Sequence, residues 1–197
     1  TLDGFGNYRF SNFVTEDKRY SFWQSERDGL ARLYRYNNAD GCCEGAVTPD
    51  GIIVQQLVQV DQKRQQIYFM ANNLPEYSDP YYHGLCRVNF DGTDFCLLTP
   101  EDGEHSVRIF PDCLADTWSR VDQPPVTVLR NRKGDLLCEV IRADISALLE
   151  AGYVLPERFH VIATDGETPL YGILIRPADM EEGKTYPFID YIYGGMQ

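Results

Sequence analysis

GLCRVNFDGTD, residues 84–94, is an alternating apolar stretch that closes on an Asp91-Gly92 pair, and the chain repeats this pattern. Alternation with a period of two is typical of a strand with one buried face, and a pair such as Asp-Gly favours a tight hairpin turn. The other two copies are LARLYRYNNADG (30–41), closing on Asp40-Gly41, and PVTVLRNRKGD (125–135), closing on Lys133-Gly134. The sequence therefore predicts three antiparallel units of one design.

Each copy follows an earlier apolar strand, and these earlier strands set the length of the repeat. They contain Phe22-Trp23, Tyr68-Phe69 and Thr117-Trp118, which are spaced 46 and 49 residues apart. The stretch VTPDG (47–51) is also echoed by LTPEDG (98–103). A period of roughly 40–50 residues with several strands per unit is typical of a β-propeller blade, whose sheets stack around an axis.

We therefore predict a mainly β fold, a partial β-propeller with about three blades of antiparallel strands. A β-sandwich, which also has short strands, is the alternative. Closed propellers have roughly four to eight blades, so further blades are expected before Thr1.

The acidic composition argues against a nucleic-acid-binding protein. The net charge is −12 and the sequence pI is about 4.6, so the basic surface of a nucleic-acid-binding protein is missing and no nucleic-acid partner is expected. No apolar run reaches the roughly 18 residues that a membrane-spanning helix needs. Hydrophobic residues make up 43% of the chain, enough to bury a core.

The six cysteines and three histidines do not form a metal-binding pattern. No C-x-x-C occurs and the histidines are scattered, so neither a metal ion nor a cofactor is expected. Cys86 and Cys96 flank the central hairpin, where facing strands could bring them within disulfide range. The sequence leaves open whether they are bridged, with free thiols favoured.

The pattern changes at residues 141–156, where a short helix is predicted to link two domains. Asp144 is a candidate for its N-cap, and Gly152 suits the C′ position just after it. We place residues 1–156 in the C-terminal part of the propeller and residues 157–197 at the start of a second domain.

The second domain is expected to open with a hairpin and a buried strand. Residues 160–163 and 170–175 flank an Asp165-Gly166 turn. Residues 187–193 are more continuously apolar, as in a strand buried on both faces of an α/β sheet. Tyr193 is followed by two glycines, and an aromatic residue at a glycine turn after a buried strand suits half of an oxyanion site.

Five segments in a fixed order carry a family resemblance that covers nearly the whole chain. They are SERDGLARLYRY (25–36), LTPEDGEHSVRIFPD (98–112), SRVDQPPVTVLR (119–130), DISALLEAG (144–152) and TPLYGILIRPADMEEGKTYPFIDYIYGG (168–195). In this order the sequence resembles the prolyl oligopeptidase family of serine peptidases, in particular its dipeptidyl peptidase IV-type branch. The last segment looks like the entry into that family's α/β-hydrolase domain.

The resemblance implies a peptidase whose propeller gates a cavity above an α/β-hydrolase domain. Its substrate would be a peptide, from whose amino terminus a Ser-His-Asp triad releases dipeptides near proline. Tyr193 matches the family's oxyanion-hole tyrosine, although Met196 stands where the family usually has proline. Two alternatives stay open: another peptidase of this family (an oligopeptidase or an acylaminoacyl peptidase), and a non-catalytic propeller that binds a protein partner.

The triad itself is not found in these residues, because no G-x-S-x-G elbow occurs. We expect a fragment that is inactive alone, with the nucleophile, aspartate and histidine elsewhere in its parent. The residues interpreted as structural or as solvated turns are His105, His160, Glu16-Asp17, Glu101-Asp102 and Glu181-Glu182. The resemblance is compatible with a homodimeric parent and favours an extracytoplasmic location, and unpaired strand edges predict self-association of the fragment.

Overall fold

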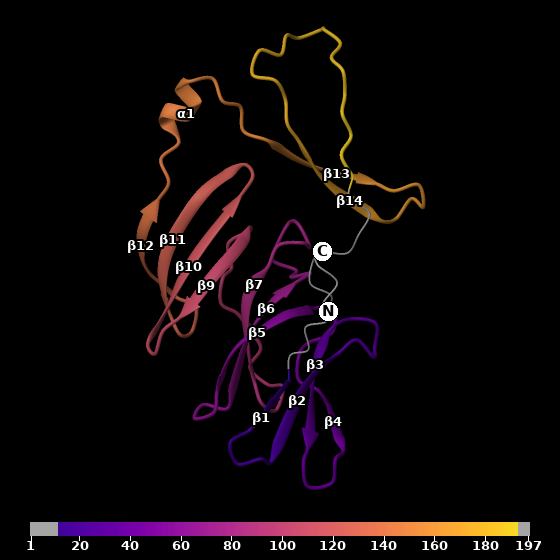
Figure 1. Ribbon diagram of the computed structural model, residues 1–197, viewed down its shortest axis with the longest axis vertical. Coiled ribbons are helices and arrows are strands. Elements are labelled where there is room, and N and C mark those ends of the chain that lie inside the picture. The colour runs from indigo at the N-terminus through magenta and orange to yellow at the C-terminus, as the bar shows by residue number, and fades with distance from the viewer. Residues whose placement is uncertain (1–11, 193–197) are drawn as a thin grey trace.

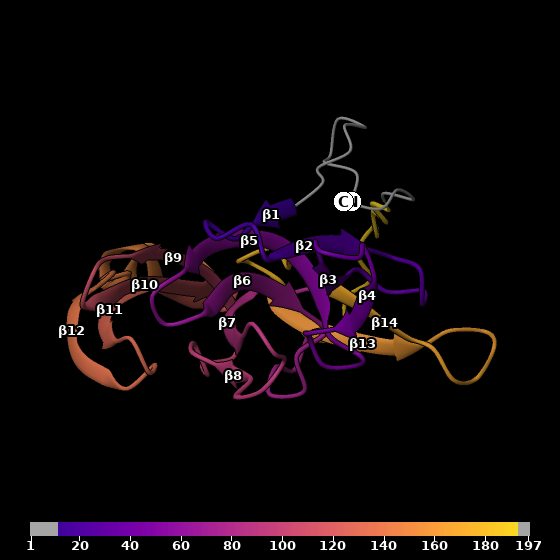
Figure 2. The ribbon, with the colours of Figure 1, turned by 90° about the horizontal axis from the view of Figure 1, so that it is seen from below.

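The computed structural model describes residues 12–192, and most of their strands form three four-stranded antiparallel sheets (Figure 1). Each sheet consists of four consecutive strands that pair in chain order. The sheets lie side by side in two perpendicular views (Figures 1 and 2). We call them blades 1, 2 and 3, because this is the arrangement of propeller blades. The prediction of a mainly β, partial propeller is confirmed.

Blade 1 contains β1 (Asn12–Val14), β2 (Tyr20–Ser25), β3 (Arg32–Asn37) and β4 (Cys43–Ala46). Blade 2 contains β5 (Ile53–Asp61), β6 (Gln66–Asn72), β7 (Gly84–Asn89) and β8 (Cys96–Leu97). Blade 3 contains β9 (Glu104–Ile109), β10 (Cys113–Arg120), β11 (Gln123–Asn131) and β12 (Leu136–Arg142).

The three predicted glycine turns join the third strand of each blade to the fourth. Gly41, Gly92 and Gly134 have left-handed φ angles of 73°, 84° and 95°, a region that side chains with a Cβ disfavour. A Cβ on Gly134 would also lie 3.0 Å from the backbone of Leu98, and one on Gly92 would lie 3.3 Å from that of Val47. The turns of blades 2 and 3 therefore pack against the link that leaves the preceding blade.

That link carries the repeated V/L-T-P sequence, and both copies make the same bonds. In blade 2, Leu98 donates its N–H to the Leu85 carbonyl at 2.8 Å, and the Thr99 hydroxyl accepts the Leu85 N–H at 2.9 Å. In blade 1 the equivalent bonds join Val47 to the Leu33 carbonyl at 2.8 Å and the Leu33 N–H to Thr48 at 3.2 Å. The repeated V/L-T-P sequence thus makes the same two hydrogen bonds to the third strand in both blades.

Blade 2 is buried on both faces, because alternate residues of β6 face opposite neighbours. Ile67 and Phe69 pack with Phe22 of blade 1, whereas Tyr68 packs with Leu114 of blade 3. None of these five side chains is more than 1% exposed. Fully burying an aliphatic or phenylalanine side chain contributes about 1.5–3 kcal/mol, so blade 2 supplies the core that joins the other two blades.

Cys86 and Cys96 are free thiols, as the sequence analysis favoured. The register of β7 and β8 places Cys86 opposite Leu97 and Cys96 opposite Arg87. The two cysteines are therefore offset by one residue and point to opposite faces of the sheet. Burial raises the pKa of the Cys86 thiol well above its ordinary value.

A short helix, α1 (Ser146–Glu150), follows blade 3 as predicted, but its N-cap differs. Ile145 occupies the N-cap, and Asp144 accepts the N–H of Ser146 at 2.9 Å from one residue further upstream. Gly152 has the left-handed φ, 89°, expected just after the helix. Within residues 12–192 no helix is long and apolar enough to cross a membrane.

The predicted hairpin is formed by β13 (Glu157–Ile162) and β14 (Pro169–Leu174) around Asp165-Gly166. The buried strand predicted at residues 187–193 is wrong for residues 187–192, which join no sheet among the described residues. Ile189 and Tyr191 are 89% and 90% exposed. An apolar run becomes a buried strand only where other strands pair with it, and the described residues supply none here.

Candidate functional site

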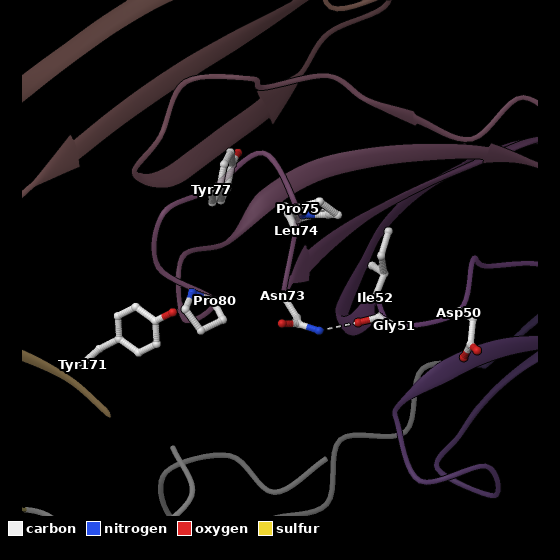
Figure 3. Close-up of a pocket in the computed structure, with 9 residues that line it drawn as sticks. All are labelled: Asp50, Gly51, Ile52, Asn73, Leu74, Pro75, Tyr77, Pro80 and Tyr171. Atoms are coloured by element: carbon white, nitrogen blue, oxygen red, sulfur yellow. Dashed lines mark hydrogen bonds between the residues drawn. The ribbon is translucent and has the colours of Figure 1, made fainter. Parts of the chain in front are cut away.

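A hollow of about 320 Å³ opens between loops of the propeller and the hairpin (Figure 3). The link entering blade 2 and the loop between β6 and β7 supply most of its wall, and β14 supplies one residue. The lining residues are Asp50, Gly51, Ile52, Asn73, Leu74, Pro75, Tyr77, Pro80 and Tyr171. The hollow thus lies where the propeller meets the hairpin.

The loop of residues 73–83 is held in shape by Asn73. This residue has a left-handed φ of 56°, and its N–H donates to the Pro80 carbonyl at 2.9 Å, which folds the loop back on itself. Its side-chain Nδ2 donates to the Gly51 carbonyl at 2.6 Å, the bond drawn in Figure 3. The loop and the link entering blade 2 therefore form one continuous rim.

Tyr77 anchors the floor of the hollow. The ring is 7% exposed, and its hydroxyl donates to the Thr99 carbonyl. Burial raises the pKa of Tyr77 far above its ordinary value, so the phenol stays neutral and keeps its donor hydrogen. Leu74 and Ile52, which are 2% and 5% exposed, complete an apolar floor.

The rim adds a carboxylate to this apolar floor. The Asp50 side chain is 93% exposed and lies 3.5 Å from Arg32. No serine, cysteine or histidine is among the described residues of the lining.

His105 and Asp116 form a buried pair that looks like two members of a catalytic triad. The His105 Nδ1 lies 2.8 Å from Asp116 Oδ1, and both side chains are fully buried. The other ring nitrogen, Nε2, lies 2.8 Å from the Glu101 carbonyl, where a triad would place a serine hydroxyl. Arg130 Nε donates to Asp116 at 3.0 Å. The pair belongs to an ionic cluster in blade 3, which agrees with the interpretation of His105 as structural.

The expectation that Glu101-Asp102 is a solvated turn is wrong. Glu101 pairs with Arg130, and Asp102 pairs with Arg120 at 3.2 Å. Their side chains are only 31% and 25% exposed. The pairs Glu16-Asp17 and Glu181-Glu182 are exposed, as expected. No neighbouring residue indicates this difference, because the arginine partners lie 29 and 18 residues away in the sequence.

Tyr193, the predicted oxyanion residue, lies outside the described residues. His160 lies on β13, with its ring centroid 6.2 Å from that of Tyr171. Two parts of the hollow, the loop of residues 73–83 and Tyr171, were not predicted from the sequence. The run NNLPEYSDP (72–80) was the available signal, because Asn, Pro, Ser and Asp together favour an ordered loop. No metal-binding group of three or more His, Cys, Asp or Glu occurs within residues 12–192.

Residues 7–125, more than half of the chain, match the family described as the dipeptidyl peptidase IV (DPP IV) N-terminal region. The chain therefore belongs to this family, as the resemblance in the sequence had indicated.

Among individual proteins, the chain is similar to dipeptidyl peptidase 8 from two mammals. It is 31% identical over 150 residues to the protein of Homo sapiens and 49% identical over 150 residues to that of Mus musculus. Each match covers 71% of this chain and 16% of the relative. The chain thus spans about a sixth of the length of these curated relatives.

Solved structures share the fold. Dipeptidyl peptidase 4 of Porphyromonas gingivalis matches with a TM-score of 0.65 and 20% identity, covering 85% of this chain and 24% of that one. A chain described as a dipeptidyl aminopeptidase IV from Bacteroides ovatus matches with a TM-score of 0.65 and 25% identity, covering 89% and 27%.

Proposed function

We propose that this chain is part of a serine-type exopeptidase that releases dipeptides, with a preference for proline, from the amino termini of peptides. The observation that carries the proposal is the hollow between blade loops and hairpin, in a chain of the dipeptidyl peptidase IV N-terminal family. In this proposal the propeller part, residues 1–156, walls and gates the substrate cavity. Residues 157–197 begin the α/β-hydrolase domain.

The chemistry is divided between this chain and its parent protein. The apolar floor formed by Ile52, Leu74 and Tyr77 would receive a substrate side chain and exclude water from it. Tyr193 would donate its phenolic hydrogen to the negative oxygen that forms when the serine attacks the carbonyl. We assign the serine, histidine and aspartate to the longer parent, since the 197 residues contain no G-x-S-x-G.

Activity assays test the assignment of Tyr193. In the full-length protein, Tyr193→Phe should lower kcat for a Gly-Pro-anilide substrate by roughly 10²–10³, the usual loss for one oxyanion donor. Tyr191→Phe is the matched control, because it removes a hydroxyl two residues earlier and should leave kcat near the parent value. An unchanged kcat in Tyr193→Phe would remove the oxyanion role.

The 197-residue chain alone should turn over no Gly-Pro-anilide when purified free of other peptidases. Turnover by it would mean that a nucleophile of a different kind lies within these residues.

In the full-length protein a Gly-Pro substrate should have a higher kcat/KM than a Gly-Ala one, and the reverse order would contradict the preference for proline.

A further inference from the structure

Arg158 of β13 reaches across to residues of two blades. Its Nη1 donates to the Ser78 hydroxyl at 2.9 Å and lies 3.6 Å from Asp102, while its Nε lies 3.3 Å from Asp122. Ser78 is in the loop between β6 and β7, Asp102 follows β8, and Asp122 is in the turn between β10 and β11. The guanidinium also lies over the Tyr82 ring, 5.9 Å from its centroid.

The acidic partners of Arg158 are held by bonds of their own. Asp102 accepts the Ser78 N–H at 2.8 Å and its hydroxyl at 2.6 Å. Arg120 donates to Asp102 at 3.2 Å and to Asp122 at 2.8 Å. We call the group Ser78, Tyr82, Asp102, Arg120 and Asp122 the Arg158 socket.

Ionisation of the socket carboxylates is favoured overall. Burial opposes ionisation of Asp102 and Asp122, but hydrogen bonds and the arginine charges hold the pKa of each below its ordinary value. The Arg158 side chain is 26% exposed. A network of several charges in this partly buried setting holds its geometry better than an isolated surface pair.

The register of the hairpin connects the socket to the hollow. Arg158 and His160 lie on one face of β13, because residues two apart share a face. Tyr171 pairs with His160 across the hairpin and so lies on that same face. Tyr171 lines the hollow and meets the Tyr81 ring edge-on, with centroids 6.2 Å apart.

We propose that Arg158 is a positioning residue, which seats the hairpin on blades 2 and 3 so that Tyr171 completes the wall of the hollow. The proposal rests on the proposed function only in treating the hollow as part of the substrate cavity. The seating itself is measurable without substrate.

Hydrogen exchange followed by mass spectrometry tests the seating in the 197-residue chain. Arg158→Met should speed exchange in residues 157–174 and in the loop of residues 73–83, and leave β6 and β10 unchanged. Arg176→Met is the matched control, because Arg176 follows β14 and pairs at 2.9 Å with Glu157 of β13, and both side chains are exposed. Arg158→Lys keeps the charge but not the forked donor, so it should restore protection in part.

A salt titration of the unaltered chain gives the same test without a substitution. High ionic strength should loosen the hairpin of the unsubstituted 197-residue chain and should have little further effect on Arg158→Met. An exchange pattern in Arg158→Met identical to that of Arg176→Met would overturn the seating role.

Kinetics of the full-length protein test the link to the hollow. Arg158→Met should raise KM for Gly-Pro-anilide by about tenfold through a misplaced wall, with a smaller change in kcat. A loosened hairpin with an unchanged KM would overturn the role of Tyr171 in the hollow. Failure of the full-length protein to turn over any dipeptide substrate would instead defeat the proposed function, while the exchange result would stand.

Discussion

Asp116 accepts hydrogen bonds on both carboxylate oxygens, from His105 at 2.8 Å and from Arg130 at 3.0 Å, and its side chain is fully buried. In Asp116→Asn, the new amide group would face one of these donors and leave it without an acceptor. The substitution also removes the buried counter-charge of Arg130, which keeps only its pair with the partly exposed Glu101. We therefore expect the free energy of unfolding to fall by about 3–5 kcal/mol. Urea denaturation followed by tryptophan fluorescence measures the loss.

The same substitution at an exposed carboxylate is the control. Asp50 is 93% exposed and lies 3.5 Å from Arg32, so Asp50→Asn should change the free energy of unfolding by only about 0–1 kcal/mol. An equal fall in the free energy of unfolding in the two variants would mean that burial of the Asp116 cluster does not determine how much it stabilises the fold.

At the scale of elements, the turn of the β13–β14 hairpin depends on the charge of Asp165. Its carboxylate accepts the Thr168 hydroxyl and the N–H groups of Thr168 and Glu167, which lower its pKa from 3.8 to about 2. A group whose pKa is lowered by folding stabilises the folded form above its unfolded pKa and loses that effect below it. The turn should therefore loosen as the pH falls from about 4 towards 2.

Proton NMR of the Thr168 and Glu167 amides between pH 5 and pH 2 follows this change. The amide shifts should move with an apparent pKa near the lowered value. In Asp165→Asn that titration should disappear, whereas Glu167→Gln should keep it. A titration that persists in Asp165→Asn would assign the effect to another acid.

The elements that could be predicted from sequence are those whose causes are local. Gly41, Gly92 and Gly134 adopt φ angles that glycine accepts most easily, and the adjacent residues are typical of turns, so these turns were predicted. The prediction of a strand at residues 187–193 is wrong for residues 187–192, because an apolar run indicates burial but does not say which strand will pair with it. The predicted N-cap of α1, Asp144, is one position too early. An aspartate can accept a nearby N–H, here that of Ser146, from the N-cap position or from the residue before it, so its presence does not fix where the helix begins.

At the scale of the whole molecule, one end of the row of blades is uncovered. Every residue of β12 is exposed, and β12 is the edge strand of its sheet. Leu137 and Ile141 are 57% and 63% exposed. Because an exposed apolar edge strand can pair with another chain, the 197-residue chain should self-associate as its concentration rises, which light scattering coupled to size exclusion measures.

Lysine substitutions locate the contact. Leu137→Lys with Ile141→Lys should shift the chain towards monomer. A variant with the same change in charge, Ala39→Lys with Gln65→Lys, alters exposed turns of blades 1 and 2 and should associate as the parent does. A constant monomer mass for the unaltered chain at all concentrations would contradict the expected association.

The candidate site was harder to predict than the blades. Asn73 and Pro80 belong to a loop whose composition indicates order, yet the sequence does not say that Gly51 and Tyr171 meet it. Arg158 bonds to Ser78, 80 residues earlier. Such contacts depend on how the blades stack, so no local pattern of residues contains them.

The pairing of strands in strict chain order has a consequence for how the protein is made. Contacts within each blade are local in sequence, and local contacts form quickly. During synthesis the amino-terminal part of a chain emerges first, so blade 1 and then blade 2 can assemble before later residues exist. The hairpin is made after all three blades, and Arg158 therefore arrives at a socket whose other members are already in place.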